Sequence, residues 1–573
     1  MKTKHEIART LKEIAFFLRL KGDNPYKALA YERAGHALLV CPEDLTRLVT
    51  NATLTEVEGI GPATASVITE LFSTGSSPLL KELQGRYPSS LVELGEVPGL
   101  SVKQIRRLYD EAGIRSLAEL QDACRKNRLL TIKGIGPKVQ ARLLAALGEY
   151  RRGQGYHLYA NVLDEVSRLE QAFKAIRGVH MVTVAGALRR KMEVIDDYHF
   201  VLKCDDPRGA TVMKGLQAVP NLTDVRVIDT HTIAAVSPIG VAITITVTPP
   251  ESYGFHVLHA TGSPEHLEQL LTRFKAEGFK SWEVVRTRLK GSSETALYRA
   301  IGLPYVPPEL REGRDELEMI NGRRRAELIE PGQIQGFFHF HTDYSDGAAT
   351  VEEMIAAARA SGYRYVGISD HSQSAFYANG MKEPRIRAQW AEINQVQQRY
   401  PDIHIFKGIE ADILPDGSMD YEDDFLAEFD FVIASVHSRF NLPEADQTRR
   451  VCRALANPYV TMLGHPTGRL LLSRPGYRLD LSQVIASAVT HRKILEINGS
   501  RHRLDLDWRV VRTAHAEGVQ FCVNPDAHAV EELRNIPLGI NVARKGGLRA
   551  ADVINTKSLA EMKTFLSRMR RAA

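Results

Sequence analysis

The chain has 573 residues, of which 44% are hydrophobic and 25% are charged, and its formal net charge is +5. This length exceeds what one hydrophobic core supports, so roughly three or four globular domains are expected. Five widely spaced cysteines without a CxxC pair argue against a disulfide framework and favour a reducing cytoplasm. The charged N-terminus lacks the apolar segment of a signal peptide, and no window approaches the roughly 18 apolar residues of a membrane span.

Three glycine-containing turns recur within the first 150 or so residues, whose apolar spacing is helical throughout. They are "VEGIGPATASVI" with Gly59 and Gly61, "VPGLSVKQIRRL" with Gly99, and "IKGIGPKVQARL" with Gly134 and Gly136. Each turn precedes a helix, whose exposed first amides can bind a phosphate oxygen. A plain helix connection explains any single turn, but three together favour sequence-independent binding to the DNA backbone.

This N-terminal region resembles the lyase domain of family X DNA polymerases, the polymerase beta type. The segment "YKALAYERA" is similar to a family helix that offers a phosphate-binding Lys and a Tyr, which are Lys27 and Tyr31 here. A solvated surface lysine remains the alternative interpretation of Lys27. The family forms a Schiff base through a Lys on the helix after the first hairpin, and that position is Val67 here. Lyase chemistry is therefore predicted to be absent.

Residues 155–325 resemble the palm and thumb of the same family. The matching segments are "VAGALRRKMEVIDDYHFVL", "GVAITITVTPPESYG", "LHATGSPEH" and "ALYRAIGLPYVPPELREG". The resemblance implies an α+β nucleotidyltransferase-like palm followed by a thumb.

The catalytic positions of this palm are depleted. Nucleotide transfer needs hard cations held by carboxylates, and residues i and i+2 of a strand share one face. Asp197 takes the first acid position of the family's Asp-x-Asp, but His199 takes the second and Thr244 the third. The family's triphosphate-binding Ser becomes Ala187, although Arg190 remains. We expect a vestigial polymerase site without nucleotidyltransferase activity.

From Phe337 onward, seven apolar strand-like runs alternate with helical segments, which predicts a parallel sheet closed into a barrel. Residues of metal-ligand type stand at the ends of six of these runs, where barrel active sites lie. The nine candidate ligands are His339, His341, Asp346, His371, Glu410, His437, His465, Asp526 and His528. Mixed imidazole and carboxylate ligands suit Zn²⁺, Mn²⁺ or Fe.

This segment resembles the PHP (polymerase and histidinol phosphatase) domain, a distorted seven-stranded barrel that holds up to three metal ions. The resemblance implies three ligand sets, one of them around Glu410 as a bridge. They are His339, His341 and Asp526; Glu410, His437 and His465; and Asp346, His371 and His528. Phe337 stands where the family often has an acid, and the loss of that outer group is expected to tune the site. A water activated at the cluster would replace a side-chain nucleophile.

Four domains are predicted. They are a lyase-like helical domain with a helix-hairpin-helix at 1–85, a second helix-hairpin-helix domain at 86–153, a degenerate palm and thumb at 154–325, and a PHP metallo-phosphoesterase at 326–573. The order is that of bacterial family X polymerases, whose PHP domain is a manganese-dependent 3′–5′ exonuclease. The resemblance also implies action at abasic sites or on 3′-phosphates.

The leading hypothesis is a monomeric, cytoplasmic DNA-repair exonuclease that uses Mn²⁺ or Zn²⁺ and acts on gapped, nicked or 3′-ended DNA. One alternative is a working repair polymerase with a metal site rearranged around Asp196, Asp197 and His199. Further alternatives are a small-molecule phosphatase of the PHP family and a DNA-binding scaffold without enzymatic activity.

Overall fold

The computed structural model describes residues 4–41, 43, 45–57, 59–95, 97, 100–132, 135–153, 155–207, 210–220, 222–320 and 327–571. The chain folds into two units. One comprises Met1–Gly155 with the short segments Pro238–Gly240 and Leu472–Arg474. The other comprises Tyr156–Ser237, Val241–Leu471 and Pro475–Ala573. The predicted domain boundaries stay predictions, and the one at 325 lies outside the described residues. No described helix is both long and apolar enough to cross a membrane.

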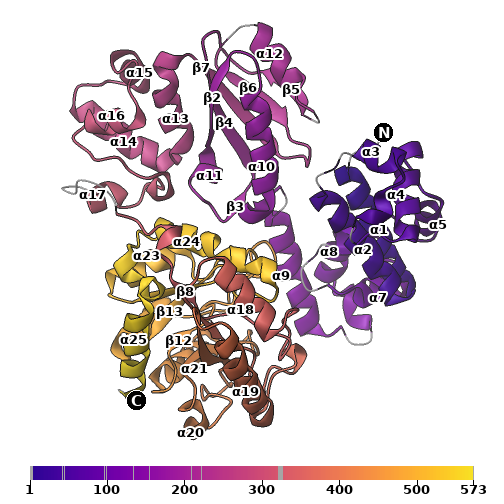
Figure 1. The fold of residues 1–573 in the computed structure, drawn as a ribbon. Helices are drawn as coiled ribbons and strands as arrows, with labels where there is room; N and C mark the ends of the chain where they lie inside the picture. The colour runs from indigo at the N-terminus through magenta and orange to yellow at the C-terminus, as the bar shows by residue number, and fades with distance from the viewer. Residues whose placement is uncertain are drawn as a thin grey trace. The chain divides into compact units, whose positions relative to one another are not determined.

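The first unit is all-helical where it is described, as the sequence predicts (Figure 1). Its elements are α1 (Lys4–Lys21), α2 (Pro25–Val40), α3 (Leu45–Thr50), η1 (Leu54–Glu56), α4 (Pro62–Thr74), α5 (Pro78–Arg86), α6 (Leu91–Gly95), α7 (Val102–Ala112), α8 (Leu117–Arg125), η2 (Arg128–Thr131) and α9 (Pro137–Gly153). In α1, Ile7, Leu11, Ile14 and Leu18 are fully buried. Their spacing of three or four residues places them on one face of the helix, which packs into the core.

The palm and thumb begin the second unit. Their elements are β1 (His157–Leu158), α10 (Tyr159–Lys174), β2 (Val179–Ala185), α11 (Gly186–Arg189), β3 (Val194–Ile195), β4 (Asp197–Cys204), α12 (Ala210–Gln217), β5 (Thr223–Val227), β6 (Thr232–Val236), β7 (Ala242–Thr248), η3 (Pro250–Ser252), α13 (Tyr253–Thr261), α14 (Pro264–Ala276), α15 (Trp282–Arg288), α16 (Glu294–Arg299), η4 (Pro308–Leu310) and α17 (Glu316–Ile320).

A five-stranded sheet forms the palm, in the order β2-β4-β7-β6-β5, and β4 and β7 run parallel. Successive side chains of β4 face opposite sides of the sheet. Phe200 meets Phe173 of α10, with ring centroids 5.0 Å apart, while Val201 packs with Val257 of α13. The sheet therefore lies between α10 and α13, as Figure 1 shows.

The remainder of the second unit is a barrel. Its elements are η5 (Pro331–Gln333), β8 (Gly336–Phe337), α18 (Val351–Ala360), β9 (Tyr365–Ile368), η6 (Phe376–Ala378), α19 (Glu383–Arg399), β10 (His404–Asp412), α20 (Asp423–Leu426), β11 (Phe431–Ser435), α21 (Glu444–Ala456), β12 (Met462–Leu463), α22 (Leu481–Thr490), β13 (Ile494–Asn498), α23 (Trp508–Ala516), β14 (Phe521–Asn524), η7 (Val530–Asn535), α24 (Ile536–Lys545), η8 (Ala550–Asp552), η9 (Ile554–Thr556) and α25 (Leu559–Arg571).

Seven parallel strands follow one another around this barrel in chain order, from β8 to β14. Just beyond the first and last strands, the His341 amide donates to the Ala527 carbonyl at 2.8 Å and the Asp526 amide to the His339 carbonyl at 3.0 Å. These bonds nearly close the barrel. The predicted fold class is thereby confirmed, with helical hairpin domains, a polymerase-type palm and thumb, and a distorted seven-stranded barrel.

Palm and barrel meet within the second unit through ion pairs, one of them made by a buried lysine. Lys545 of α24 is fully buried and donates to the Glu312 carboxylate at 2.6 Å and to the Arg190 carbonyl at 2.9 Å. Arg509 of α23 donates to Glu193 at 2.9 Å. Removing one partner of a buried ion pair costs more stability than forming the pair provides, because the other charge is then left buried and unpaired. These contacts therefore hold the two regions in one arrangement.

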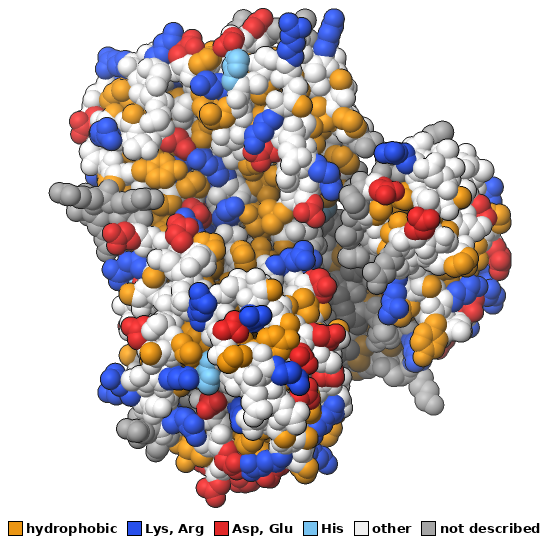
Figure 2. Space-filling model, viewed as in Figure 1, with side chains coloured by type: hydrophobic (Ala, Val, Ile, Leu, Met, Phe, Trp, Pro, Cys, Tyr) orange, Lys and Arg blue, Asp and Glu red, His pale blue; other side chains and the backbone are white. Residues whose placement is uncertain are grey.

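Lys and Arg side chains intermingle with Asp and Glu over the face drawn in Figure 2. On that face they do not gather into a single basic surface. Net charge alone therefore gives no location for a polyanion, and the candidate site must come from the geometry of particular residues.

Candidate metal centre

All nine candidate ligands lie at or just beyond the carboxyl ends of barrel strands, because parallel strands end at one rim. Glu410 is within β10, and the others follow β8, β9, β11, β12 and β14. His339 and His341 are fully buried, whereas the Asp346 and His528 side chains are about one-third exposed, at 32% and 37%. The ligand cluster is therefore closed to solvent around His339 and His341 and accessible around Asp346 and His528.

His339, His341 and Asp526 form the first group. The Asp526 Oδ1 atom lies 3.4 Å from Nε2 of His339 and 3.4 Å from Nε2 of His341. Two ligands of a tetrahedral ion at metal–ligand distances of about 2.1 Å stand about 3.4 Å apart. The donor spacing thus suits a transition-metal ion.

Glu410 lies at the centre of the second group. Its Oε1 atom is 2.9 Å from Nε2 of His465 and 3.3 Å from Nε2 of His437, and these two nitrogens are 3.3 Å apart. The same oxygen is 3.3 Å from Nε2 of His339. One carboxylate oxygen therefore faces both groups, which is the position of the bridging ligand that the resemblance implies.

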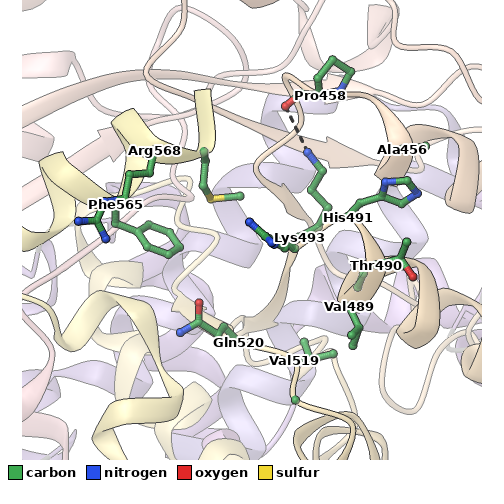
Figure 3. A pocket seen from close by; sticks show the side chains of 14 residues that line it. Ala456, Pro458, Val489, Thr490, His491, Lys493, Val519, Gln520, Phe565 and Arg568 are labelled. Atoms are coloured by element: carbon green, nitrogen blue, oxygen red, sulfur yellow. Dashed lines mark hydrogen bonds between the residues drawn. The ribbon is translucent and has the colours of Figure 1, made fainter. Parts of the chain in front are cut away.

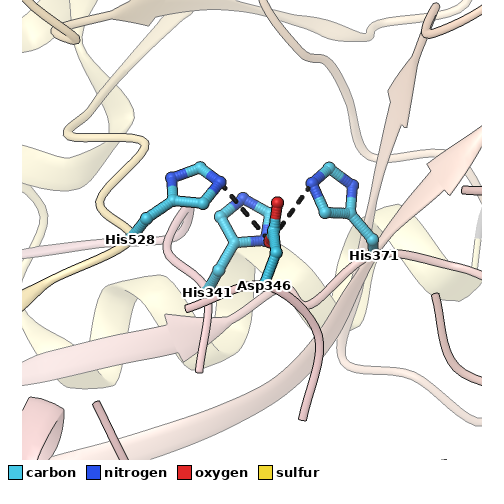
Figure 4. A group of neighbouring side chains, drawn as sticks. All are labelled: His341, Asp346, His371 and His528. Atoms are coloured by element: carbon cyan, nitrogen blue, oxygen red, sulfur yellow. Dashed lines mark ion pairs between the residues drawn. The ribbon is translucent and has the colours of Figure 1, made fainter. Parts of the chain in front are cut away.

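The third group surrounds Asp346 (Figure 4). Its Oδ1 atom lies 3.5 Å from Nε2 of His528, 3.6 Å from Nε2 of His371 and 3.8 Å from Nδ1 of His341. The ring of His341 thus faces Asp526 with one nitrogen and Asp346 with the other. Because a neutral imidazole has one lone pair for a metal, His341 can serve only one of these two groups at a time.

Two further carboxylates orient the ligands from behind. Glu496 accepts from Nδ1 of His339 at 2.7 Å, and Asp412 from Nδ1 of His437 at 2.6 Å. Such partners fix the tautomer and leave the opposite nitrogen for the metal. The sequence reasoning missed both residues. For Glu496 the available signal was an acid between apolar residues of the fully buried strand "ILEIN" of β13.

The polar side chains of Asn498 and Arg469 form their hydrogen bonds with other residues of the protein. Asn498 donates to Asp526 Oδ2 at 3.0 Å, and Arg469 donates to Arg503 O at 3.0 Å and pairs with Asp507. Asn498 therefore positions a ligand, and Arg469 ties two loops together.

Several buried ligand atoms form no hydrogen bond. They are His339 Nε2, both ring nitrogens of His341, His371 Nδ1 and Glu410 Oε2. Buried polar atoms are nearly always paired, so a cluster of unpaired ones facing one another fits a cation-binding site. Outside the barrel, no comparable group of His, Cys, Asp or Glu occurs among the described residues.

The pKa shifts divide the cluster. Despite burial, Glu410 raises the pKa of His437 to about 10 and Asp346 raises that of His528 to about 9, so a metal must displace these protons. His341 and Glu410, in contrast, are already shifted toward their metal-binding forms. Burial, with the neighbouring His528 and His371 rings, lowers the pKa of His341 to about 3, so its imidazole is neutral. Burial alone would raise the pKa of Glu410, but the rings of His437, His339 and His371 hold it well below its ordinary value. Neutral imidazole and ionised carboxylate are the ligand forms.

Two candidate ligands also have unusual backbones. His465 has φ of 24° and Asp526 of 50°, in the left-handed region that side chains other than glycine avoid. Such conformations persist where surrounding contacts enforce them, commonly at functional sites.

Phe337, where the family often has an acid, is fully buried against the rings of Phe340 and Tyr363, with ring centroids 5.6 and 5.0 Å away.

In the palm, only one carboxylate remains at the three expected acid positions. Nε2 of His199 lies 2.6 Å from Asp197 Oδ2, so the remaining acid is paired with the histidine that occupies the second acid position. Thr244 is the β7 partner of His199 in the ladder. Arg190 is largely buried and pairs with Glu312 at 3.1 Å. Ala187 lies in α11.

Among the described residues, the glycines of the predicted hairpin turns lie in the turns that precede α4 and α9. Gly59 has φ of 92°, and Gly61 directly precedes α4 with open space around its α-carbon. Gly136 directly precedes α9 and is similarly open. Gly99 and Gly134 lie outside the described residues.

The lysine and tyrosine of the N-terminal helix differ in exposure. Lys27 is exposed and lies 3.5 Å from the Asp23 carboxylate, whereas Tyr31 is buried. Val67, at the position of the family's Schiff-base Lys, is buried in α4. Lys27 is thus available to a phosphate, and Tyr31 belongs to the core.

A cavity of about 690 Å³ opens at the opposite end of the barrel, among the loops that precede the strands (Figure 3). Val489, His491, Lys493, Gln520 and Phe565 are among the residues that line it. None of the nine candidate ligands is among its lining residues. The cavity and the ligand cluster are therefore separate features.

Four family profiles match the chain. They are a helix-hairpin-helix domain at 2–77, a SAM-like helix-hairpin-helix tandem at 91–149, a DNA polymerase beta thumb at 256–312 and a PHP domain at 338–499. Together with the sheet orders and the ligand cluster, they define a multidomain DNA-binding protein with a metal-dependent phosphoesterase barrel.

Relatives extend the match to the whole chain. The DNA polymerase/3′-5′ exonuclease PolX of Bacillus subtilis (strain 168) is 36% identical over 573 residues, 99% of each chain. The chain therefore belongs to the bacterial family X DNA polymerases that carry a C-terminal PHP domain. A probable phosphatase of Thermoanaerobacter sp. (strain X514) is 26% identical over 41% of this chain and 94% of its own. A probable phosphatase of Caldicellulosiruptor saccharolyticus is 30% identical over 33% of this chain and 78% of its own.

Proposed function

We propose that this protein is a 3′–5′ exonuclease of DNA repair whose palm binds DNA without extending it. One observation carries the proposal. In the barrel, nine ligand-type residues gather into groups whose donor atoms lie within 4.8 Å of one another, whereas Asp197 in the palm faces a histidine at 2.6 Å. Hydrolysis of a phosphodiester needs the first arrangement, and nucleotide transfer needs carboxylates that the second lacks.

The barrel would hold up to three Mn²⁺ or Zn²⁺ ions on its nine ligands, with Glu410 between two of them. When bound, such ions supply Lewis acidity and a water of lowered pKa, so no side-chain nucleophile is required. Glu496 and Asp412 hold the His339 and His437 rings in the metal-binding tautomer. Buried carboxylates without an opposing charge are unfavourable, which makes the cluster selective for cations.

Arg503 is the candidate phosphate contact. Its Nε atom lies 3.3 Å from Asp526 Oδ2, and its side chain is 21% exposed. A guanidinium beside the ligand cluster attracts a phosphate and neutralises charge that develops on its oxygens. Arg503 would thereby orient the scissile group.

The hairpin turns around Gly59, Gly61 and Gly136 would contact the DNA backbone through helix N-terminal amides, with Lys27 adding charge. Such contacts carry no sequence information, so binding should depend on salt and on DNA structure. We propose gapped, nicked or 3′-ended DNA as substrate, and a cytoplasmic monomer as the working form.

A primer assay tests the proposal. The protein is incubated with Mn²⁺ and a 5′-labelled primer in a gapped duplex, with and without nucleotides. Stepwise shortening of the primer under both conditions, abolished by a chelator, is the expected result. Primer extension that Asp197→Ala removes would overturn the inactive palm and would favour a working polymerase with a rearranged site.

A phosphatase is the second candidate, because relatives named probable phosphatases align with the barrel. Release of a terminal 3′-phosphate, or cleavage at an abasic site, would extend the same chemistry to other DNA ends. Turnover of a small phosphomonoester at a higher kcat/KM than DNA would favour the small-molecule activity. A barrel that binds no metal ion would leave a non-enzymatic scaffold.

A further inference from the structure

Two aromatic side chains stand exposed beside the ligand cluster. Phe376 is 86% exposed and Tyr377 is 70% exposed. Large aromatic side chains are normally buried, and a rigid exposed group of them commonly marks a binding surface. They occupy η6, a short turn in the loop that follows His371.

The turn lies directly over the candidate ligands. The Tyr377 ring centroid is 6.1 Å from that of His371 and 6.2 Å from that of His437. His371 faces Asp346 in the third group and Glu410 in the second. Tyr377 therefore stands beside ligands that a substrate phosphate would reach.

The base of the turn is fixed, although its tip is exposed. Ala375 and Ala378, on either side of the two aromatic residues, are buried. The Gly380 amide donates to the Ala375 carbonyl at 3.0 Å, and a β-carbon at Gly380 would lie 1.9 Å from the Ser372 carbonyl. Asn379 donates to the Ser345 carbonyl at 3.2 Å. The rings are thus presented by an ordered backbone, which reduces the entropy lost when a partner binds.

We propose that Phe376 and Tyr377 form a stacking subsite for the base of the nucleotide at the DNA end. This inference rests on the proposed exonuclease function and adds a determinant of its substrate class. A nucleobase has an aromatic face whatever its identity, so stacking is tolerant of sequence. With the phosphate at the ligand cluster, the base would lie one sugar away, within reach of the Tyr377 ring, and the exposed ring of Phe376, its neighbour in the chain, would extend the same surface.

The subsite explains how the site would choose a nucleoside-bearing phosphate over a plain phosphomonoester. The metal ligands and Arg503 recognise phosphate of any origin. The two rings add an interaction that only an aromatic substituent can make, so the base becomes a recognised part of the substrate.

The test removes the ring and the base separately. Two 5′-labelled strands differ only in their 3′-terminal unit, which carries a base or is an abasic tetrahydrofuran. Initial rates with Mn²⁺ are compared for wild type, Phe376→Ala, Tyr377→Ala and the double variant. Tyr377→Phe and Phe376→Tyr keep a ring, and Val489→Ala is the control for truncating an exposed apolar side chain at the far end of the barrel.

Wild type should favour the base-bearing end by roughly 5- to 150-fold in kcat/KM, the factor that corresponds to one base–aromatic stack. The double alanine variant should lose this preference, and the ring-retaining variants should keep it. Equal losses on both strands would show that the turn acts only on the shape of the site, and would overturn the subsite. An unchanged preference would mean that the rings contact something else, and would overturn it as well.

A binding measurement separates this inference from the proposed function. Unlabelled base-ended and abasic-ended strands compete against a fluorescent strand, which requires no turnover. A protein that hydrolyses neither strand would refute the exonuclease. The subsite would still be tested by whether the base-ended strand competes better with wild type than with the double alanine variant.

Discussion

The palm and the barrel of this protein both place polar side chains at strand ends, but these side chains have different partners in the two regions. In the palm, the apolar side chains of β4 remain packed between α10 and α13, while Asp197 pairs with His199. In the barrel, buried ligand atoms are left without hydrogen bonds but face one another. Packing preserves a fold, whereas a group of unpaired buried ligand atoms that face one another is what a bound cation would compensate. We therefore expect the metal chemistry in the barrel rather than in the palm.

The largest expected effect comes from removing barrel ligands. His339→Ala/His341→Ala should reduce exonuclease activity by more than the roughly 10- to 100-fold loss that is typical when a residue hydrogen-bonded to a metal ligand is replaced. Activity is measured as shortening of a labelled primer with Mn²⁺. His491→Ala, an exposed histidine at the other end of the barrel, is the control and should retain wild-type activity. Full activity in the double variant would place the chemistry elsewhere.

The contact between palm and barrel should matter more for stability than the pair of Asp197 with His199. Lys545→Met leaves the buried Glu312 carboxylate without one of its partners and should lower the free energy of unfolding by about 3–5 kcal/mol. Urea unfolding measures the change. Lys563→Met, an exposed lysine on α25, is the matched control. Equal stability of the two variants would show that the contact contributes little.

An intermediate effect is expected at Glu496. Glu496→Gln keeps the shape but weakens the acceptor that orients His339, so metal affinity or activity should fall by roughly 10- to 100-fold. Titration with Mn²⁺ gives the affinity, and Glu517→Gln at an exposed helix end serves as control. A variant that binds metal like wild type would remove Glu496 from the site.

The smallest effect should follow from Asp197→Ala. Its side chain is 39% exposed, so loss of the pair with His199 should cost at most about 1 kcal/mol of stability. Exonuclease activity should be unchanged. A loss of nucleotide incorporation in this variant would instead reveal a working palm.

The sequence was sufficient for the fold class because the barrel strands are apolar runs, six of which end in a residue of metal-ligand type. The nine candidate ligands were chosen from the same pattern, and the structure brings their side chains together. The double-sided position of His341 could not be predicted, because it depends on how β8 and β14 meet. Glu496 and Asp412 were missed because a partner on another strand gives them their role. The exposure of Phe376 and Tyr377 likewise depends on the path of one turn.

Metal content per chain tests the central claim most directly. Wild type, His339→Ala/His341→Ala and Asp197→Ala are equilibrated with Mn²⁺, desalted and analysed for bound metal. We expect up to three ions in wild type, the same number in Asp197→Ala, and fewer in the double histidine variant. A full complement in the double variant, or an ion lost with Asp197→Ala, would contradict this expectation, because the metal would then lie in the palm.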